Sequence, residues 1–287
     1  MREKYLNVMA QIQENRTTGN IMKGIKALTL ALAASTLISA CSTSPTGRKQ
    51  FVLLPDSKLN EMGVASFNQM KEEIPATQNE ETSRSVQCIA DRIIAVLPDQ
   101  YRNQEWEVRV FESDQVNAFA LPGNKIGVYT GLLNVAQNQS QLAAVMGHEV
   151  GHVLARHGNE RVSTQLATSQ ALAIGYQVSG EDTPEKKAIF QGLGIGAQVG
   201  IILPFSRTHE SEADLIGLQL MAKAGFDPRE SVSLWQNMSK AGSSKTPELL
   251  STHPSNNTRI NDLNTAMSGP LNVYNDLKAQ GKVANCY

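Results

Sequence analysis

The sequence has few cysteines and no excess of charge of either sign. Its three cysteines, Cys41, Cys88 and Cys286, do not lie at the spacing of zinc ligands, which excludes a cysteine-based zinc site. The 26 basic and 27 acidic residues give a net charge of −1. Without residues 1–40 the net charge becomes about −4, so nucleic acid is not an expected partner.

Long hydrophobic runs are also lacking. The apolar run 27–37 is too short to span a bilayer, but it follows two lysines and precedes residues 38–41, which match a bacterial lipobox. Residues 1–40 are therefore predicted to be a signal peptide, with Met22 as an alternative start, and Cys41 to be the lipidated first residue. The serine after Cys41 favours an outer-membrane lipoprotein that faces the periplasm. An uncleaved anchor is the alternative.

The sequence HEVGH is the clearest chemical signal. On a helix, His148 and His152 lie one turn apart on the same face, and Glu149 lies at their flank. Zinc binds neutral imidazole nitrogens, and a catalytic site keeps three protein ligands and an open position. The helix is expected to begin at the N-cap Asn138 and to stop at Gly158. The pattern predicts a zinc hydrolase site, and two histidines on an ordinary amphipathic helix are the alternative.

A second acidic helix, SRTHESEAD, is expected to supply the third ligand. Glu210 and Asp214 lie one turn apart on it, so Glu210 can complete a site of two histidines and one glutamate. Asp214 can then hydrogen-bond a ligand imidazole. Glu212 is interpreted as a solvated residue of the acidic face, and His157 and His209 as surface residues without a role.

Two further segments, NAFALPG at 117–123 and Thr-His-Pro at 252–254, complete an ordered set of four motifs. With them the chain resembles the membrane-associated zinc metallopeptidases that include the HtpX heat-shock proteases, the CAAX prenyl endopeptidases and the periplasmic LoiP and BepA proteases. The resemblance extends over residues of about 105–265. Because the chain lacks the multiple transmembrane helices of HtpX and the prenyl endopeptidases, it resembles the periplasmic branch most.

The resemblance implies roles for the site residues. His148, His152 and Glu210 would bind one zinc ion, Glu149 would be the catalytic base, and Asp214 would orient a ligand histidine.

His253 has three alternative roles. By the resemblance it lies near the zinc, where it would either cap the metal in a resting state or donate to the oxyanion. Alternatively, it is a helix-start residue, because Pro254 suits the first turn of a helix that runs through Arg259.

These parts predict a zinc-dependent endopeptidase. Glu149 would move the proton of the attacking water, and an extended substrate would pair with an edge strand from the segments 117–121 and 126–129. Such backbone pairing favours loose specificity, so misfolded or unassembled envelope proteins are the expected substrates. The alternative is a zinc-containing lipoprotein that acts as a chaperone or scaffold, with latent protease activity. The outer-membrane assembly machinery is a candidate partner.

If Cys41 carries lipid, Cys88 and Cys286 have only one pairing. A disulfide between them is expected in the oxidising periplasm, and two free buried thiols are the alternative.

The expected class is α+β, a predominantly helical zincin-type fold with a small sheet beside the HEVGH helix. Helices are predicted over 55–73 and 80–97, strands around 106–110 and 117–129, and helices after 131.

The expected domain organisation is a linker over 41–54 followed by a single metallopeptidase domain over 55–287. Within this domain, segment 161–205 contains a glycine-rich apolar run at 192–203. A mobile lid or membrane-touching segment is one hypothesis for it, and an ordinary packed helix pair is the other.

Overall fold

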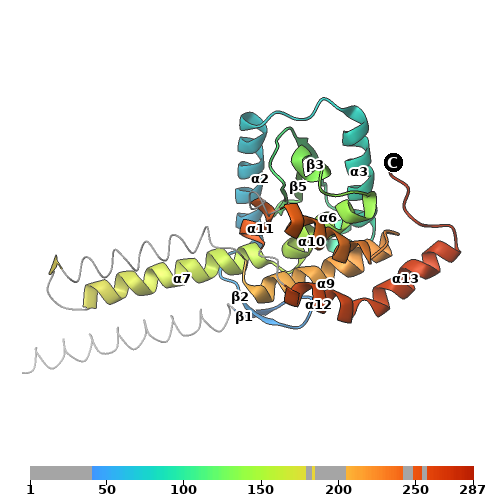
Figure 1. Cartoon of the computed structure of the whole chain (residues 1–287). Helices are drawn as coiled ribbons and strands as arrows, with labels where there is room; N and C mark the ends of the chain where they lie inside the picture. Colours follow the sequence, from blue (N-terminus) through green and yellow to red (C-terminus); the bar gives the residue numbers. More distant parts are fainter. Residues whose placement is uncertain (1–40, 179–182, 185–204, 242–247, 254–256) are drawn as a thin grey trace, which may run out of the picture.

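The protein is described as a computed structural model. The described residues are 41–178, 183–184, 205–241, 248–253 and 257–287 (Figure 1). The predicted signal peptide, the apolar run at 192–203 and Pro254 lie outside them.

The chain forms a small sheet surrounded by helices, as expected for the α+β class. The strands of this sheet are β3 (Glu107–Phe111), β4 (Ala118–Leu121) and β5 (Lys125–Tyr129). The sheet order is β3-β5-β4, with β3 parallel and β4 antiparallel to β5. Both outer strands therefore have an edge, and β4 is the one that contacts the helix with the HEVGH sequence.

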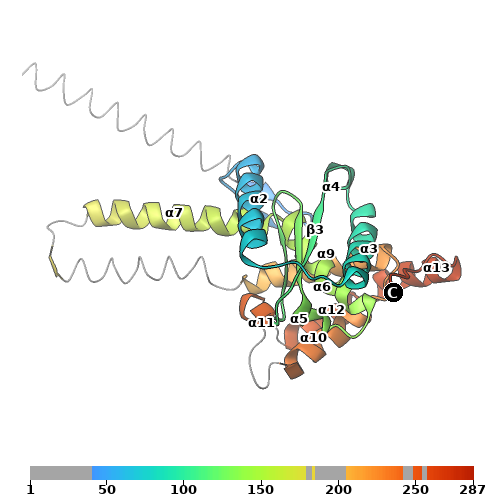
Figure 2. The ribbon, with the colours of Figure 1, turned by 90° about the horizontal axis from the view of Figure 1, so that it is seen from above.

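Alternating side chains explain why helices cover both faces of the sheet. Val110 and Val128 belong to the main core with α3 (Glu80–Ala95), whereas Phe111 and Tyr129 pack with Phe67 of α2 (Asp56–Glu73). Successive strand residues point to opposite faces, so the sheet lies between α2 and α3 (Figures 1 and 2).

The remaining helices follow the sheet, apart from the short α4. They are α4 (Asp99–Arg102), α5 (Thr130–Leu133), α6 (Gln139–Leu154), α7 (His157–Val178), α9 (Arg207–Lys223), α10 (Glu230–Ala241), α11 (Glu248–Thr252), α12 (Asn257–Ala266) and α13 (Ser268–Ala279). The prediction of helix after residue 131 is confirmed for the described part of the chain. None of the described helices is both long and apolar enough to cross a bilayer.

Helix α6, which carries HEVGH, begins where the sequence predicts. The Asn138 side chain accepts hydrogen bonds from the backbone N–H groups of Ser140 and Gln141, each 3.0 Å long. The predicted stop at Gly158 is wrong, because α6 ends at Leu154 and Gly158 lies inside α7. The turn between the two helices uses the left-handed conformation at Arg156 (φ 55°), not at a glycine.

Glycines let α6 and α9 cross at close range. A Cβ atom on Gly217 would lie 2.7 Å from the backbone nitrogen of His148, and one on Gly151 would lie 2.9 Å from the carbonyl oxygen of Ala213. Both neighbours are backbone atoms, which cannot rotate away. The glycine of HEVGH therefore sets the distance between the two helices that carry the predicted ligands.

Replacing Gly217 with alanine is expected to lower the free energy of unfolding by about 1–3 kcal/mol, because the helices must move apart. Urea unfolding measures this loss. Gly269→Ala is the matched control, since nothing lies within 4 Å of its added Cβ in helix α13. A Gly217→Ala protein as stable as the control would show that the crossing tolerates a methyl group.

Residues 41–51, expected as part of a linker, form an antiparallel hairpin of β1 (Cys41–Thr43) and β2 (Lys49–Phe51). The hairpin lies against the start of α7, and the backbone N–H of Leu53 donates to Ser163 at 2.8 Å. This segment is thus ordered against the helices, whereas a linker would run free.

Helix α7 extends away from the body formed by the sheet and the other described helices (Figures 1 and 2). Its Leu166 and Ile174 are 40% and 59% exposed. The lid hypothesis concerns segment 161–205, of which the apolar run at 192–203 lies outside the described residues.

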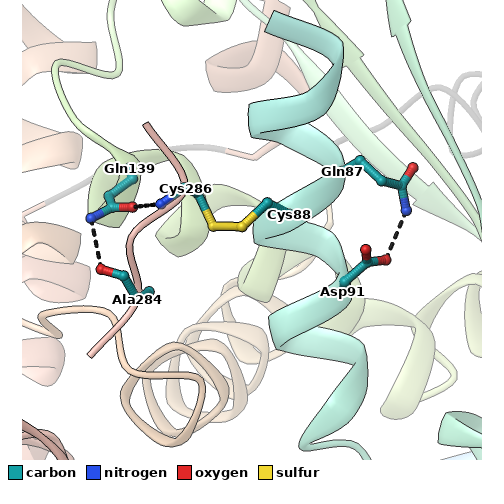
Figure 3. Close-up of a disulfide and its surroundings, with 6 residues drawn as sticks. All are labelled: Gln87, Cys88, Asp91, Gln139, Ala284 and Cys286. Atoms are coloured by element: carbon teal, nitrogen blue, oxygen red, sulfur yellow. Dashed lines mark hydrogen bonds between the residues drawn. A yellow bond between two sulfur atoms is a disulfide. The ribbon is translucent and has the colours of Figure 1, made fainter. Parts of the chain in front are cut away.

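A disulfide joins Cys88 of α3 to Cys286 in the C-terminal tail (Figure 3). The tail is also fixed at the start of α6, because Gln139 accepts from the backbone N–H of Cys286 at 2.8 Å and donates to the carbonyl of Ala284 at 3.0 Å. The last residues thereby connect α3 to the helix that carries HEVGH.

Candidate metal centre

Four side chains from three parts of the chain meet in the interior. His148 and His152 come from α6, Glu210 from α9, and His253 from the segment after α11. All four are buried, and one possible ligand atom of each lies within 4.8 Å of the others. The structure thus brings together the three predicted ligands and His253.

The distances within this cluster fit a tetrahedral zinc ion. The Nε2 atoms of His148 and His152 are 3.1 Å apart, and the two oxygens of Glu210 each lie 3.5 Å from one of them. A tetrahedron with zinc–ligand bonds of about 2.0–2.1 Å has edges of about 3.3 Å. The spacings are therefore close to those between the ligands of one zinc ion, with each carboxylate oxygen of Glu210 near one of the two imidazoles.

The hydrogen bonds of His148 also favour a cation. Its Nδ1 lies 2.9 Å from Oδ1 of Asp214, so this nitrogen carries a proton and Nε2 is the nitrogen that faces the cluster, where a bound metal ion would take the place of a second proton. Burial opposes a positive charge on His148, but hydrogen bonds with Asp214 and Glu210 raise its pKa to about 9. The two carboxylates thus favour positive charge at this point.

Arg259 of α12 holds both carboxylates, which sequence reasoning did not foresee. Its Nε and Nη2 donate to the two oxygens of Asp214, each at 2.7 Å, and its Nη1 lies 2.7 Å from Glu210. The guanidinium lies 3.9 Å from the centre of the Trp235 ring. Nothing local in the sequence marks this arginine, because its carboxylate partners lie 45 or more residues away.

Glu149 is buried beside the cluster and is available to accept a proton. Its Oε1 has no hydrogen-bond partner among the described residues and lies 3.6 Å from Nε2 of His253. Burial raises the pKa of Glu149. A carboxylate with a raised pKa is suited to general acid–base work near neutral pH.

His253 occupies the remaining corner of the cluster. Its Nδ1 lies 3.0 Å from Glu210 and 3.3 Å from Nε2 of His148, which again matches a tetrahedral edge. The alternative of a helix-start residue depends on Pro254, which lies outside the described residues; in the described part of the chain α11 ends at Thr252 and α12 runs over Asn257–Ala266.

Three residues expected at the surface are instead buried. His157, His209 and Glu212 are 0%, 8% and 5% exposed. Burial lowers the pKa of His157 to about 4. Burial raises the pKa of Glu212, but hydrogen bonds from its neighbours outweigh this effect and lower it to about 2. The sequence pattern did not reveal them, because their partners lie far away along the chain or in another helix. Glu212 accepts from Arg48 of the N-terminal hairpin, His209 bonds Glu160 of α7, and His157 bonds Glu212.

A cleft of about 280 Å³ opens beside His152. Its wall includes Ala120 of β4, Gly123 after β4, and Arg156. Phe205, at its inner end, lies 4.1 Å from the His152 ring and 5.1 Å from the His253 ring, centre to centre. The cleft therefore connects a sheet edge to the metal cluster.

A helix with HEVGH, crossed by a helix with a glutamate ligand and placed beside a small sheet, defines the class of zincin-type zinc metallopeptidases. A profile of peptidase family M48 matches residues 80–267. The chain belongs to peptidase family M48. The resemblance drawn from the motifs is thereby confirmed, as is zinc as the cofactor.

Curated relatives from two settings are similar to this chain. The mitochondrial metalloendopeptidase OMA1 of Arabidopsis thaliana is 40% identical over 177 residues, covering 61% of this chain and 34% of the relative. OMA1 of Bos taurus is 31% identical over 240 residues, with 79% and 46% covered. The β-barrel assembly-enhancing protease of Yersinia pestis is 30% identical over 210 residues, with 70% and 43% covered. The chain thus spans between about a third and a half of these relatives.

Proposed function

We propose that this chain is a zinc-dependent endopeptidase of the bacterial cell envelope that cleaves misfolded or unassembled proteins. The observation that carries the proposal is the placement of Glu149. This buried carboxylate lies beside a cluster of side chains whose possible ligand atoms lie within 4.8 Å of one another, and it has an oxygen with no partner among the described residues.

Each residue of the site has a separate role in the proposed hydrolysis. His148, His152 and Glu210 hold the zinc, and Asp214 keeps the His148 ring in the tautomer that directs Nε2 to the metal. When bound, zinc supplies Lewis-acid polarisation of a carbonyl and lowers the pKa of water. Glu149 accepts the proton of the attacking water and delivers it to the leaving amine.

The edge of β4 suits an extended substrate. In the described part of the chain β4 pairs with β5 alone, so its other edge can pair with a peptide backbone. Ala120 of this strand lines the cleft that reaches His152. Backbone pairing carries little sequence information, which supports substrates that are unfolded.

The envelope location rests on three features of the chain. The lipobox predicts a lipid anchor at Cys41, the Cys88–Cys286 disulfide suits an oxidising compartment, and one relative is named for β-barrel assembly. We therefore propose an outer-membrane lipoprotein that faces the periplasm and acts near the outer-membrane assembly machinery. The mitochondrial names of other relatives belong to those proteins.

The test of this function is degradation of casein, an unfolded protein, by the full chain in detergent. Cleavage is expected with zinc, with loss after a chelator and recovery when zinc is restored. Absence of cleavage by a chain that has bound one zinc per molecule would contradict the proposal.

A second candidate function is a chaperone or assembly scaffold with latent protease activity. It is favoured by His253, whose Nδ1 lies where a fourth ligand would close the tetrahedron. A site closed by four protein ligands has no position for water or substrate. In this case the resting chain binds unfolded proteins without cutting them until His253 moves.

Replacing His253 with alanine distinguishes these candidates. If His253 closes the site, casein cleavage is expected to rise, because the fourth position becomes open. If His253 donates to the oxyanion, the rate is expected to fall by about 10²–10³-fold. Rates are measured at one bound zinc per chain, with His209→Ala as a control that removes an imidazole outside the cluster.

A further inference from the structure

A line of buried polar groups connects the N-terminal hairpin to the ligand His152. Nδ1 of His152 lies 2.9 Å from Nδ1 of His157. Nε2 of His157 lies 3.1 Å from Oε2 of Glu212, and Nε of Arg48 donates to the same oxygen at 2.7 Å. The line therefore crosses from α6 through α7 and α9 to the hairpin.

The proton positions along this line follow from the carboxylate. Glu212 can only accept, so Nε2 of His157 carries a proton and donates it. Nδ1 of a neutral His157 is then an acceptor, and Nδ1 of His152 must donate to it. His152 is left with a lone pair on Nε2, which is the atom that faces His148 and Glu210.

The two ligand histidines are thus held in parallel ways. His148 meets the carboxylate of Asp214 directly, and Arg259 fixes that carboxylate. His152 is connected to the carboxylate of Glu212 through the imidazole of His157, and Arg48 holds that carboxylate in place. In both cases an arginine and a carboxylate determine which ring nitrogen is free for the metal.

The hairpin holds this line at several points. Thr46 donates to the second oxygen of Glu212, and Arg48 also forms two hydrogen bonds to Glu160, at 2.9 and 2.7 Å. Gln50 donates to the carbonyl of Ala155, in the turn between α6 and α7. Residues 44–50 therefore contact the segments on both sides of His157.

We infer that His157 and Glu212 are positioning residues for the zinc ligand His152, and that Arg48 makes the N-terminal hairpin part of the metal centre. The inference rests on the proposed metal site, although it does not require that the chain cleaves casein. Its physical content is the orientation and tautomer of one imidazole, which zinc binding reports directly.

The alternative is a structural role, in which these polar groups only fasten the hairpin to the helices. A structural role predicts that substitutions of these polar groups lower the melting temperature. It predicts no change in zinc affinity at temperatures where the variants are still folded. Zinc affinity and metal spectra therefore separate the two readings, whereas stability alone does not.

The experiment measures zinc affinity by competition with a chromophoric chelator, and the visible spectrum of the Co²⁺-loaded full chain. His157→Phe keeps a planar ring but accepts no hydrogen bond from His152, so zinc affinity is expected to fall by about 10–100-fold and the Co²⁺ bands to shift. His157→Gln can accept from His152 and donate to Glu212, so it is expected to restore most of the affinity.

Arg48→Met is the second variant, since Arg48 lies at the edge of the line with 23% of its side chain exposed. A smaller loss of zinc affinity is expected from it. Lys49→Met is the matched control, because it removes the same charge from an exposed position of the same hairpin. Among the described residues, the Nζ of Lys49 donates to the Thr43 side chain alone.

Unchanged zinc affinity and Co²⁺ spectra in folded His157→Phe and Arg48→Met would overturn the inference. If His157→Phe does not fold, Arg48→Met decides alone: zinc affinity below that of Lys49→Met sustains the inference, and equal affinity overturns it. The two proposals can fail separately. If the wild-type chain binds zinc but does not cleave casein, while the variants bind zinc more weakly, the inference stands and the proposed endopeptidase function is contradicted.

Discussion

Glu149→Gln is expected to slow casein cleavage by about 10²–10⁴-fold, because the amide cannot accept and return a proton during hydrolysis. Zinc binding is expected to persist, since Glu149 lies at the flank of the cluster and is not one of the four residues whose ligand atoms converge. The rate is measured with saturating zinc, and bound zinc is counted for each preparation.

Two measurements make the Glu149→Gln result specific. Glu61→Gln, on the exposed face of α2, is the control for loss of one carboxylate and should leave the rate unchanged. Melting temperature of both variants checks that the fold persists. Retained activity in Glu149→Gln would remove the proposed general base and with it the proposed mechanism.

Arg259→Met is expected to lower the free energy of unfolding by about 3–5 kcal/mol, because it leaves the buried carboxylates of Glu210 and Asp214 without their cation. Methionine keeps much of the side-chain volume against Trp235. Urea unfolding of the chelator-treated chain measures the loss without any contribution from bound metal.

Arg229→Met is the matched control, because Arg229 pairs with Asp227 at the surface with 60% of its side chain exposed. Its loss is expected to be at most about 1 kcal/mol. Arg259→Lys should restore little stability, since an ammonium group cannot reach both oxygens of Asp214 and one of Glu210 together. Equal losses for Arg259→Met and Arg229→Met would refute a buried ion-pair role.

The sequence predicted those parts of the centre that depend on helical periodicity. His148 and His152 are related by one turn of one helix, as are Glu210 and Asp214, so their faces follow from spacing alone. The two helices predicted at 55–73 and 80–97 and the strand predicted at 106–110 followed from apolar spacing and alternation, and their observed ends differ from the predicted ones by one or two residues.

The parts that the sequence did not reveal depend on contacts between distant segments. Nothing in the local sequence distinguishes Arg259 or His157. Their roles depend on contacts made in the fold: Arg259 of α12 bonds Asp214 of α9, and His157 of α7 bonds Glu212 of α9. The hairpin has strands of only three residues each, and its long-range ion pairs, not strand propensity, hold it in place. The end of α6 was also mispredicted, because the left-handed residue after it is Arg156 and not a glycine that the sequence would reveal.

The disulfide closes a covalent loop of the chain that contains the residues of the metal centre. Cys88 and Cys286 are 198 residues apart, and every residue assigned here to the metal, except Arg48 and its hairpin, lies between them. A single backbone cut within that loop, including one that the enzyme makes in a neighbouring copy, leaves the two pieces joined. Self-digestion inside the loop therefore releases a fragment only after a second cut or after reduction of the disulfide.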